Sequence, residues 1–397
     1  MNILSLLIQP FNVLMLGCYN LAIYVQFVSQ IETNLLGNIT YITQQIFFSV
    51  YLIRPIGAIF FGYIADKYSQ KLASMLTTLC MISGMLIFSL LSASFFPITM
   101  FTIAQCLICL SVSGGEGTTF IEIYYEFTQY RNTALSIVSI SFFYGLILGN
   151  GVSAIIKSFL SSDSLLIYGW RIGFGIGVIL CIMLAFIQFF TTINYDNKSQ
   201  TYTTAITVNS ISQLKNWSLS IFYIALPVLC MESIMYHILF TIMDIHMPVS
   251  TYIRILQNVC TVILTPLLGF FLDKLSQKSS KTRLLQVINI AMYSCSIFTL
   301  ITGVLPTVVL LVFIPIVLSI MYSITLIYLL PIILQYNNSA QLIGLLYNTN
   351  SLITSIICMK VSPSCFNLIF VGIGISGILS ILYKQSIEAK NTININI

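Results

Sequence analysis

The stretch "GYIADKYSQK" at residues 62–71 returns as "GFFLDKLSQK" at residues 269–278, which is 207 positions further along the chain (269 − 62). Both copies follow a long apolar run, and both read Gly, three residues, Asp, Lys, one residue, Ser, Gln, Lys. A single loop of this kind is an ordinary basic turn at a membrane surface. Two copies in the same register predict that the chain consists of two related halves.

The composition places these halves in a membrane. Hydrophobic residues make up 58% of the 397 positions, charged residues make up 7%, and the mean hydropathy is +0.98. A soluble domain carries about 25% charged residues, which it needs to cover its surface. The composition therefore predicts an all-α integral membrane protein in contact with the lipid bilayer.

Apolar stretches long enough to cross a bilayer, about 20 residues each, recur through the whole sequence. About twelve transmembrane helices are predicted, near residues 5–28, 44–65, 72–94, 98–122, 134–157, 168–192, 217–241, 251–272, 284–304, 306–334, 342–360 and 365–383. The polar stretch 195–216 divides them six and six. We therefore expect an N-terminal six-helix bundle at 1–194, a cytoplasmic linker at 195–216, and a C-terminal six-helix bundle with a short cytoplasmic tail at 217–397.

The orientation follows from the basic residues, because Lys and Arg accumulate in cytoplasmic loops. An N-terminus inside the cell places eleven of them inside, namely Lys67, Lys71, Arg131, Lys198, Lys215, Lys274, Lys278, Lys281, Arg283, Lys384 and Lys390. Lys157, Arg171, Arg254 and Lys360 then lie outside. This balance predicts a multi-pass protein of the cell (inner) membrane with both termini in the cytoplasm. It also explains the net charge of +5 without a nucleic-acid partner.

No pattern in the sequence indicates an enzyme, a metal site or a cofactor. The ten cysteines fall almost entirely within predicted spans, and Cys106 and Cys109 form a CxxC that is interpreted as packing within an apolar helix. His237 and His246 have no second metal-binding residue at helical spacing.

Three further stretches carry a resemblance to a known family. They are "RPIGAIFFGYIADKY" at 54–68, "SGGEGTTFIEIYYEFTQYR" at 113–131 and "YGWRIGFGIGV" at 168–178. In this order, and with this topology, they resemble the metabolite:proton symporter branch of the major facilitator superfamily, which includes proline/betaine transporters. The resemblance implies the major facilitator fold, with a solute site between the bundles and alternating access to it.

The sequence departs from that branch at several positions. Where its first helix usually carries acids, "GCYNLAIY" offers Gly17 and the neutral Asn20. Ser69 and Gln70 replace the usual Gly and Arg of the loop, and Gln129 and Tyr130 replace a Pro and an Asp before Arg131. These departures leave proton coupling an open question.

Arg54 and Glu116 are the first candidates for substrate binding or proton coupling. Arg54 precedes Asp66 by 12 residues, and Glu116 precedes Glu126 by 10, which places them about 18 Å and 15 Å along helices that run in the same direction. An unpaired charge at that depth costs at least about 2.5–3.5 kcal/mol. We therefore expect the two to face each other or to share a cavity, where Arg54 could hold a carboxylate and Glu116 a proton or a cationic group. A pair that only locks two helices is the alternative.

Two further acids are candidates for the same role. Glu122 lies four residues before Glu126 on one helix face, where two ionised acids repel. Glu232 lies about 15 residues into a span that begins at the cytoplasm. Five tyrosines are possible members of an aromatic cage for a quaternary ammonium group. These are Tyr19, Tyr24, Tyr124, Tyr144 and Tyr236.

The resemblance implies that charged and small residues at the cytoplasmic helix ends form a gate, and simple anchoring at the lipid headgroups is the alternative. The aspartate of the repeated loop can cap a helix N-terminus, and its glycine permits close helix approach. The resemblance adds Glu126 and Arg131. The expected gate comprises Gly62, Asp66, Lys67, Glu126, Arg131, Gly269, Asp273 and Lys274.

The predicted function is secondary active transport, by proton symport, of a small zwitterionic or carboxylated solute such as proline or betaine. The expected partners are this organic solute and protons, and a monomer is the expected functional unit. Alternatives are an uncoupled facilitator, and a transporter-derived sensor or inactive relic.

Overall fold

The computed structural model describes residues 12–36, 50–92, 96–127, 130–192 and 251–278, together with the single residues 316, 319 and 348. Within these residues the regular structure is entirely helical. The helices are α2 (Val13–Leu36), η1 (Val50–Ile53), α4 (Arg54–Lys67), α5 (Gln70–Leu90), α6 (Pro97–Glu126), α7 (Arg131–Ser139), α8 (Ser141–Phe159), α9 (Ser162–Ser164), η2 (Leu165–Gly169), α10 (Trp170–Thr192) and α12 (Thr251–Lys278). Six of the described segments are long and apolar enough to cross a membrane.

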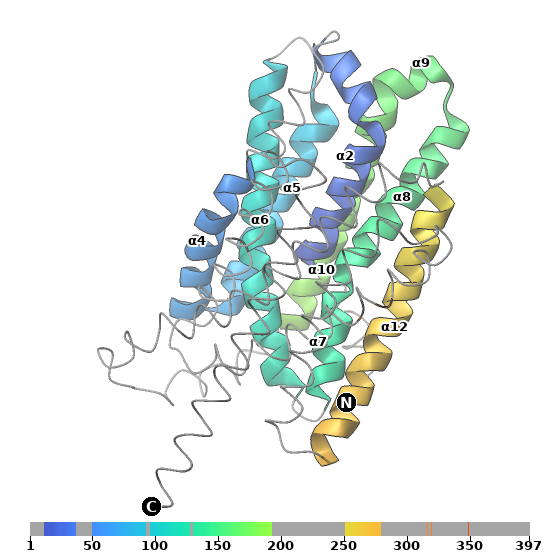
Figure 1. The fold of residues 1–397 in the computed structure, drawn as a ribbon. Coiled ribbons are helices and arrows are strands. Elements are labelled where there is room, and N and C mark those ends of the chain that lie inside the picture. The colour runs from blue at the N-terminus through green and yellow to red at the C-terminus, as the bar shows by residue number, and fades with distance from the viewer. Residues whose placement is uncertain are drawn as a thin grey trace, which may run out of the picture.

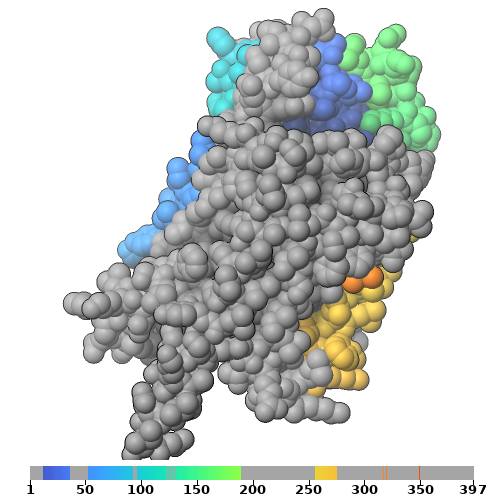
Figure 2. Space-filling model, viewed as in Figure 1, coloured from blue at the N-terminus to red at the C-terminus, as the bar shows by residue number. Residues whose placement is uncertain are grey.

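The long helices run side by side (Figure 1). In the described part, α6 packs against α5, α4 and α2, while α2 also packs along α8 and α10 packs on α5. The helix from the predicted C-terminal half, α12, lies along α7 and α8. Figure 2 shows α4 and α12 on opposite sides of the same view. The arrangement places α12, from the predicted C-terminal half, against helices of the predicted N-terminal half.

The first helix extends further than the sequence predicts. The predicted span ends at residue 28, whereas α2 continues to Leu36. Phe27, Ile31 and Leu35 continue the buried stripe at four-residue spacing, so this last part still packs on the core although polar residues surround it. At its start, Asn12 Oδ1 accepts the Met15 N–H at 3.1 Å, and Asn12 Nδ2 donates to Ser141 Oγ at 2.9 Å.

The two copies of the repeated loop differ in structure. In the first copy, α4 ends at Lys67, and extended Ser69 caps α5 by accepting the Leu72 N–H at 3.1 Å. The second copy is helical throughout, because α12 continues to Lys278. The helix therefore continues beyond the predicted membrane span, which ends at residue 272. Equivalent sequences here form a turn in one copy and the last turns of a helix in the other.

Candidate functional site

Arg54 and Glu116 form a buried ion pair between α4 and α6. Arg54 Nη2 lies 3.2 Å from Glu116 Oε1, and the two side chains are only 10% and 9% exposed. Arg54 stands at the junction where η1 gives way to α4, directly before Pro55. Proline is tolerated in the first turn of an α-helix, where its missing N–H has no helical partner to lose. The two charges face each other, as their matched depth in the sequence predicts.

Glycines and small residues bring α4 and α6 close enough for this pair. A Cβ on Gly57 would lie 2.2 Å from Ser113 Oγ and 2.9 Å from the Leu110 carbonyl oxygen. On the opposite side of the contact, a Cβ on Gly114 would lie 2.4 Å from the ring of Phe61. Neither distance is possible for a real side chain, so the close approach requires glycine at both positions. The "SGGEG" sequence thus places Glu116 within reach of α4.

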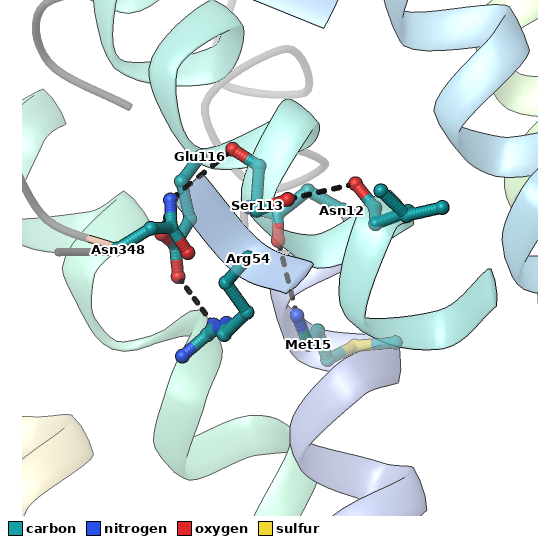
Figure 3. A network of polar contacts seen from close by, with 7 residues as sticks. Asn12, Met15, Arg54, Ser113, Glu116 and Asn348 are labelled. Atoms are coloured by element: carbon teal, nitrogen blue, oxygen red, sulfur yellow. Dashed lines mark hydrogen bonds and ion pairs between the residues drawn. The ribbon is translucent and has the colours of Figure 1, made fainter. Parts of the chain in front are cut away.

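A third residue, Asn348, completes the site from the predicted C-terminal half. Asn348 Nδ2 lies 3.2 Å from Glu116 Oε2 and 3.4 Å from the Ser113 carbonyl oxygen (Figure 3). Its side chain is fully buried. Sequence reasoning missed this residue, although an amide within the apolar span predicted at 342–360 was a usable signal, because polar groups there seek partners on other helices.

The site can exchange partners without changing its total charge. Arg54 and Glu116 neutralise each other, which removes most of the cost of burying either one. A carboxylate that binds the Arg54 guanidinium displaces Glu116 and adds one negative charge. A proton on Glu116, or a cationic group on the same solute, restores neutrality. The geometry is therefore suited to a carboxylate accompanied by a proton, or to a zwitterion.

A second polar contact lies where α12 meets α7. Asp273 accepts hydrogen bonds from the backbone N–H groups of Asn132 and Thr133 at 3.1 Å and 2.9 Å, and from the Thr133 hydroxyl at 2.6 Å. These N–H groups belong to the first turn of α7, which has no earlier carbonyl to bind. The prediction that the loop aspartate caps a helix N-terminus is confirmed for Asp273.

Gly269 fits the same contact between α12 and α7. A Cβ at this position would lie 2.4 Å from Ser136 Oγ and 2.9 Å from the Asn132 carbonyl oxygen. Lys274, one residue after Asp273, is exposed and places its ammonium group 4.6 Å from the centre of the Phe270 ring. The small residue and the acid therefore make the contact, while the lysine lies beside it.

The other predicted gate residues in the first half contact tyrosines where the structure describes them. Lys67 Nζ donates to Tyr63 Oη and lies 5.6 Å from the centre of the Tyr68 ring. Arg131 Nε donates to the Tyr124 carbonyl at 3.1 Å, and the guanidinium stacks 3.9 Å from the centre of the Tyr124 ring.

The structure describes fewer contacts for the remaining predicted site residues. Gly62 is buried and Asp66 is half-buried near the end of α4. Glu122 and Glu126 lie on α6, but their side chains are outside the described residues, as is all of Glu232. A contact of Glu126 with Lys67 or Arg131, and the roles of Glu122 and Glu232, stay predictions.

Three of the five candidate cage tyrosines take part in contacts between or within helices. Tyr19 Oη donates to the Gly173 carbonyl at 2.6 Å, Tyr24 packs against Phe101, and Tyr124 holds Arg131. Tyr144 is half-buried, and Tyr236 lies outside the described residues. Tyr19 and Tyr24 are both at least 95% buried, so these two rings already serve the packing of the bundle.

Asn20 occupies the position where the resemblance implies an acid. Its side chain is only 2% exposed, and Oδ1 has no hydrogen-bond partner in the described part of the chain. The first helix therefore contributes a neutral amide to the interior.

Comparisons with known proteins agree with this geometry. A sequence model of the Major Facilitator Superfamily matches residues 11–359. A proline/betaine transporter of Salmonella typhimurium is 30% identical over 143 residues, which span 34% of this chain and 28% of the relative. An alpha-ketoglutarate permease of Escherichia coli is 26% identical over 151 residues, spanning 37% of this chain and 35% of the relative. These alignments cover about a third of each relative at most.

A solved structure supports the same fold over nearly the whole chain. The proton:xylose symporter XylE, bound to 6-bromo-6-deoxy-D-glucose, superposes with a TM-score of 0.74 over 97% of this chain and 95% of that chain, at 13% sequence identity. The helices, the repeated loop and the superfamily match agree. The chain therefore belongs to the Major Facilitator Superfamily, and it is a multi-pass membrane protein.

Proposed function

We propose that the protein carries a small zwitterionic or carboxylated solute, such as proline or betaine, across the cell inner membrane by proton-coupled symport. The observation that carries the proposal is the buried Arg54–Glu116 pair, which Asn348 contacts from the predicted C-terminal half. The names of the two relatives add support, because proline, betaine and alpha-ketoglutarate all carry a carboxylate that fits a guanidinium.

In this mechanism the solute carboxylate replaces Glu116 at Arg54. Glu116 then binds the proton, or the cationic group of a zwitterion, so that no uncompensated charge remains in the membrane interior. Reorientation of the N-terminal bundle (1–194) against the C-terminal bundle (217–397) exposes the loaded site to the other side. Both termini and the linker 195–216 lie in the cytoplasm.

The Asp273 contact with α7 serves as part of the cytoplasmic gate. It joins a helix of the C-terminal bundle to one of the N-terminal bundle at their predicted cytoplasmic ends. Gly62, Asp66, Lys67, Glu126, Arg131, Gly269 and Lys274 complete the proposed gate. Breaking a few hydrogen bonds there is enough to shift the balance of two states, because such an equilibrium responds to a few kcal/mol.

An uncoupled facilitator is the second candidate, and Asn20 is the observation that favours it. A neutral amide stands at the position where the resemblance implies an acid in the first helix, so one proton site of that branch is replaced by a group that does not titrate. The solute would then equilibrate across the membrane without being concentrated.

Uptake by proteoliposomes separates these possibilities. We would measure labelled proline and labelled betaine with and without an inward proton gradient, with an ionophore as control. Accumulation that collapses with the ionophore supports symport, whereas equilibration alone supports the facilitator. Folded protein that transports neither solute contradicts the proposed substrates and favours the sensor or relic.

Three variants test whether the ion pair takes part in transport or only holds two helices together. Arg54→Gln and Glu116→Gln each remove one charge of the buried pair and keep the other, whereas the double variant removes both. If the pair is only a lock, the double variant regains transport relative to either single one. We expect the double variant to fold and yet stay inactive, while Lys157→Gln, which removes a charge outside the pair, keeps transport.

A further inference from the structure

Glu116 divides its two carboxylate oxygens between different parts of the chain. Oε1 faces Arg54 of α4 at 3.2 Å, and Oε2 faces Asn348, 232 positions later, at the same distance (Figure 3). The same Asn348 amide group also reaches the Ser113 carbonyl oxygen at 3.4 Å. One carboxylate therefore holds both a helix of its own bundle and a residue of the other predicted bundle.

We infer that Asn348 is a positioning residue that ties the C-terminal bundle to Glu116, and that this tie depends on the charge of the carboxylate. The inference rests on the proposed function only in that alternating access gives the two bundles a movement to control. An N–H group donates more strongly to a carboxylate than to a neutral oxygen. Neutralisation of Glu116, by a proton or by a cationic group of the solute, therefore weakens the tie.

The contact of Asn348 with the Ser113 carbonyl oxygen is longer than its contact with Glu116. The distance of 3.4 Å to the Ser113 carbonyl lies beyond the usual range for an N–H···O hydrogen bond. Asn348 is fully buried, so water does not readily take the place of the lost partner. Loading of Glu116 thus weakens the shorter of these two contacts between the bundles.

The second half of the chain differs from the first at the position equivalent to Arg54. The position equivalent to Arg54 in the second half is Thr261 (54 + 207), and the Thr261 carbonyl accepts a hydrogen bond from Ser319 Oγ at 3.4 Å. The C-terminal bundle thus has an uncharged contact where the N-terminal bundle has an ion pair. A neutral amide from that bundle can sense the Glu116 charge without adding a charge that would need its own partner.

The inference predicts how the gate responds when no solute is present. Ser136 is buried against Gly269 where α7 meets α12, so Ser136→Cys gives a reporter whose alkylation requires that contact to open. In inside-out vesicles, we expect Asn348→Leu to speed alkylation by a membrane-impermeant maleimide about fivefold, the factor for one lost hydrogen bond. The same protein without Ser136→Cys gives the background from native cysteines.

Two comparisons make this result specific. Asn258→Leu removes another buried amide, on α12, and we expect no change in the reporter. Glu116→Gln removes the charge itself, so this single variant should also speed alkylation. The double variant Glu116→Gln/Asn348→Leu should then react at nearly the same rate as Glu116→Gln. Equal effects of Asn348→Leu with and without Glu116→Gln, or no effect at all, would overturn the inference.

Transport measurements separate this role from a purely structural one, because a structural role would affect solute exchange and solute accumulation equally. With labelled proline, Asn348→Leu should lower the accumulation driven by a proton gradient by a larger factor than it lowers solute exchange. Equal losses of exchange and accumulation would show a structural role and contradict the inference. Wild-type protein that fails to transport proline counts against the proposed substrate alone, because the alkylation experiment needs no solute.

Discussion

Asp273 of α12 binds Thr133 of α7 through both the backbone and the side chain. Asp273 Oδ2 accepts the Thr133 N–H at 2.9 Å and the Thr133 hydroxyl at 2.6 Å, while Oδ1 accepts the Asn132 N–H at 3.1 Å. The acid is 6% exposed and lies at the positive end of a helix. A helical residue of the second repeat thus caps a helix of the first half.

Removal of this cap should open the contact between α12 and α7. Hydrogen bonds to a charged group contribute about 1.5–3 kcal/mol each, so we expect Asp273→Ala to shift the closed state by roughly tenfold or more. The alkylation rate at Ser136→Cys measures the shift. Asp163→Ala removes an exposed acid near the opposite helix ends and is the matched control. An unchanged rate in Asp273→Ala would show that other contacts hold this end closed.

The close approach of α4 and α6 should tolerate no added methyl group at Gly57. A Cβ there would lie 2.2 Å from Ser113 Oγ and 2.9 Å from a backbone oxygen, so α4 must move away from α6. Overpacking of this kind costs about 1–3 kcal/mol. We expect Gly57→Ala to lower the midpoint of thermal unfolding and to reduce transport, because it separates Arg54 from Glu116.

Gly151 provides the opposite case on α8. A Cβ at this position meets nothing within 4 Å, so Gly151→Ala should be neutral or stabilising by up to about 1 kcal/mol. The same unfolding measurement compares the two variants directly. Similar destabilisation by both would mean that the effect at Gly57 comes from the helix itself and not from its contact with α6.

Tyr19 should contribute to stability and not to recognition of a quaternary ammonium group. Its hydroxyl donates to the Gly173 carbonyl at 2.6 Å within a fully buried contact between α2 and α10. We expect Tyr19→Phe to reduce the free energy of unfolding by about 1 kcal/mol, since one buried hydrogen bond is lost. The KM for betaine, measured in proteoliposomes, should stay unchanged. A raised KM at unchanged stability would return Tyr19 to the list of cage residues.

The sequence predicts the position of a residue along the helix axis better than the side of the helix on which that residue lies. Counting residues from the loops placed Arg54 and Glu116 at the same depth, and the aspartate of the repeat was expected to cap a helix. Both contacts depend mainly on position along the helix axis. Which residue of the other predicted half would face Glu116 depends on how the helices pack, and Asn348 therefore escaped prediction.

Helix ends were predicted less well because burial continues beyond the apolar run. The polar residues after position 28 suggested that the first helix ends there, yet Ile31 and Leu35 remain buried and the helix reaches Leu36. Similarly, the "DKLSQK" of the second repeat resembles a loop, but Asp273 binds α7 while α12 continues to Lys278. Contacts with neighbouring helices decide both ends.

Arg171 should hold three helices together near their predicted outer ends. Its Nε and Nη2 donate to the Leu91 carbonyl at 3.0 Å and 2.9 Å, just beyond α5, and Nη2 also reaches Asn34 Oδ1 of α2 at 3.2 Å. The guanidinium lies 4.3 Å from the centre of the Trp170 ring. The planar guanidinium has several N–H groups that can donate to these partners at the same time, whereas a lysine ammonium is a single compact donor group.

We therefore expect Arg171→Lys to reduce the free energy of unfolding by about 1–3 kcal/mol, although the charge is kept. Asn34→Ala removes only one of these partners, so its effect on the thermal unfolding midpoint should be smaller. At temperatures where Arg171→Lys is folded, its KM for a transported solute should match wild type, because Arg171 lies apart from the Arg54–Glu116 pair. Unchanged stability together with a raised KM would instead place Arg171 on the path that the solute takes.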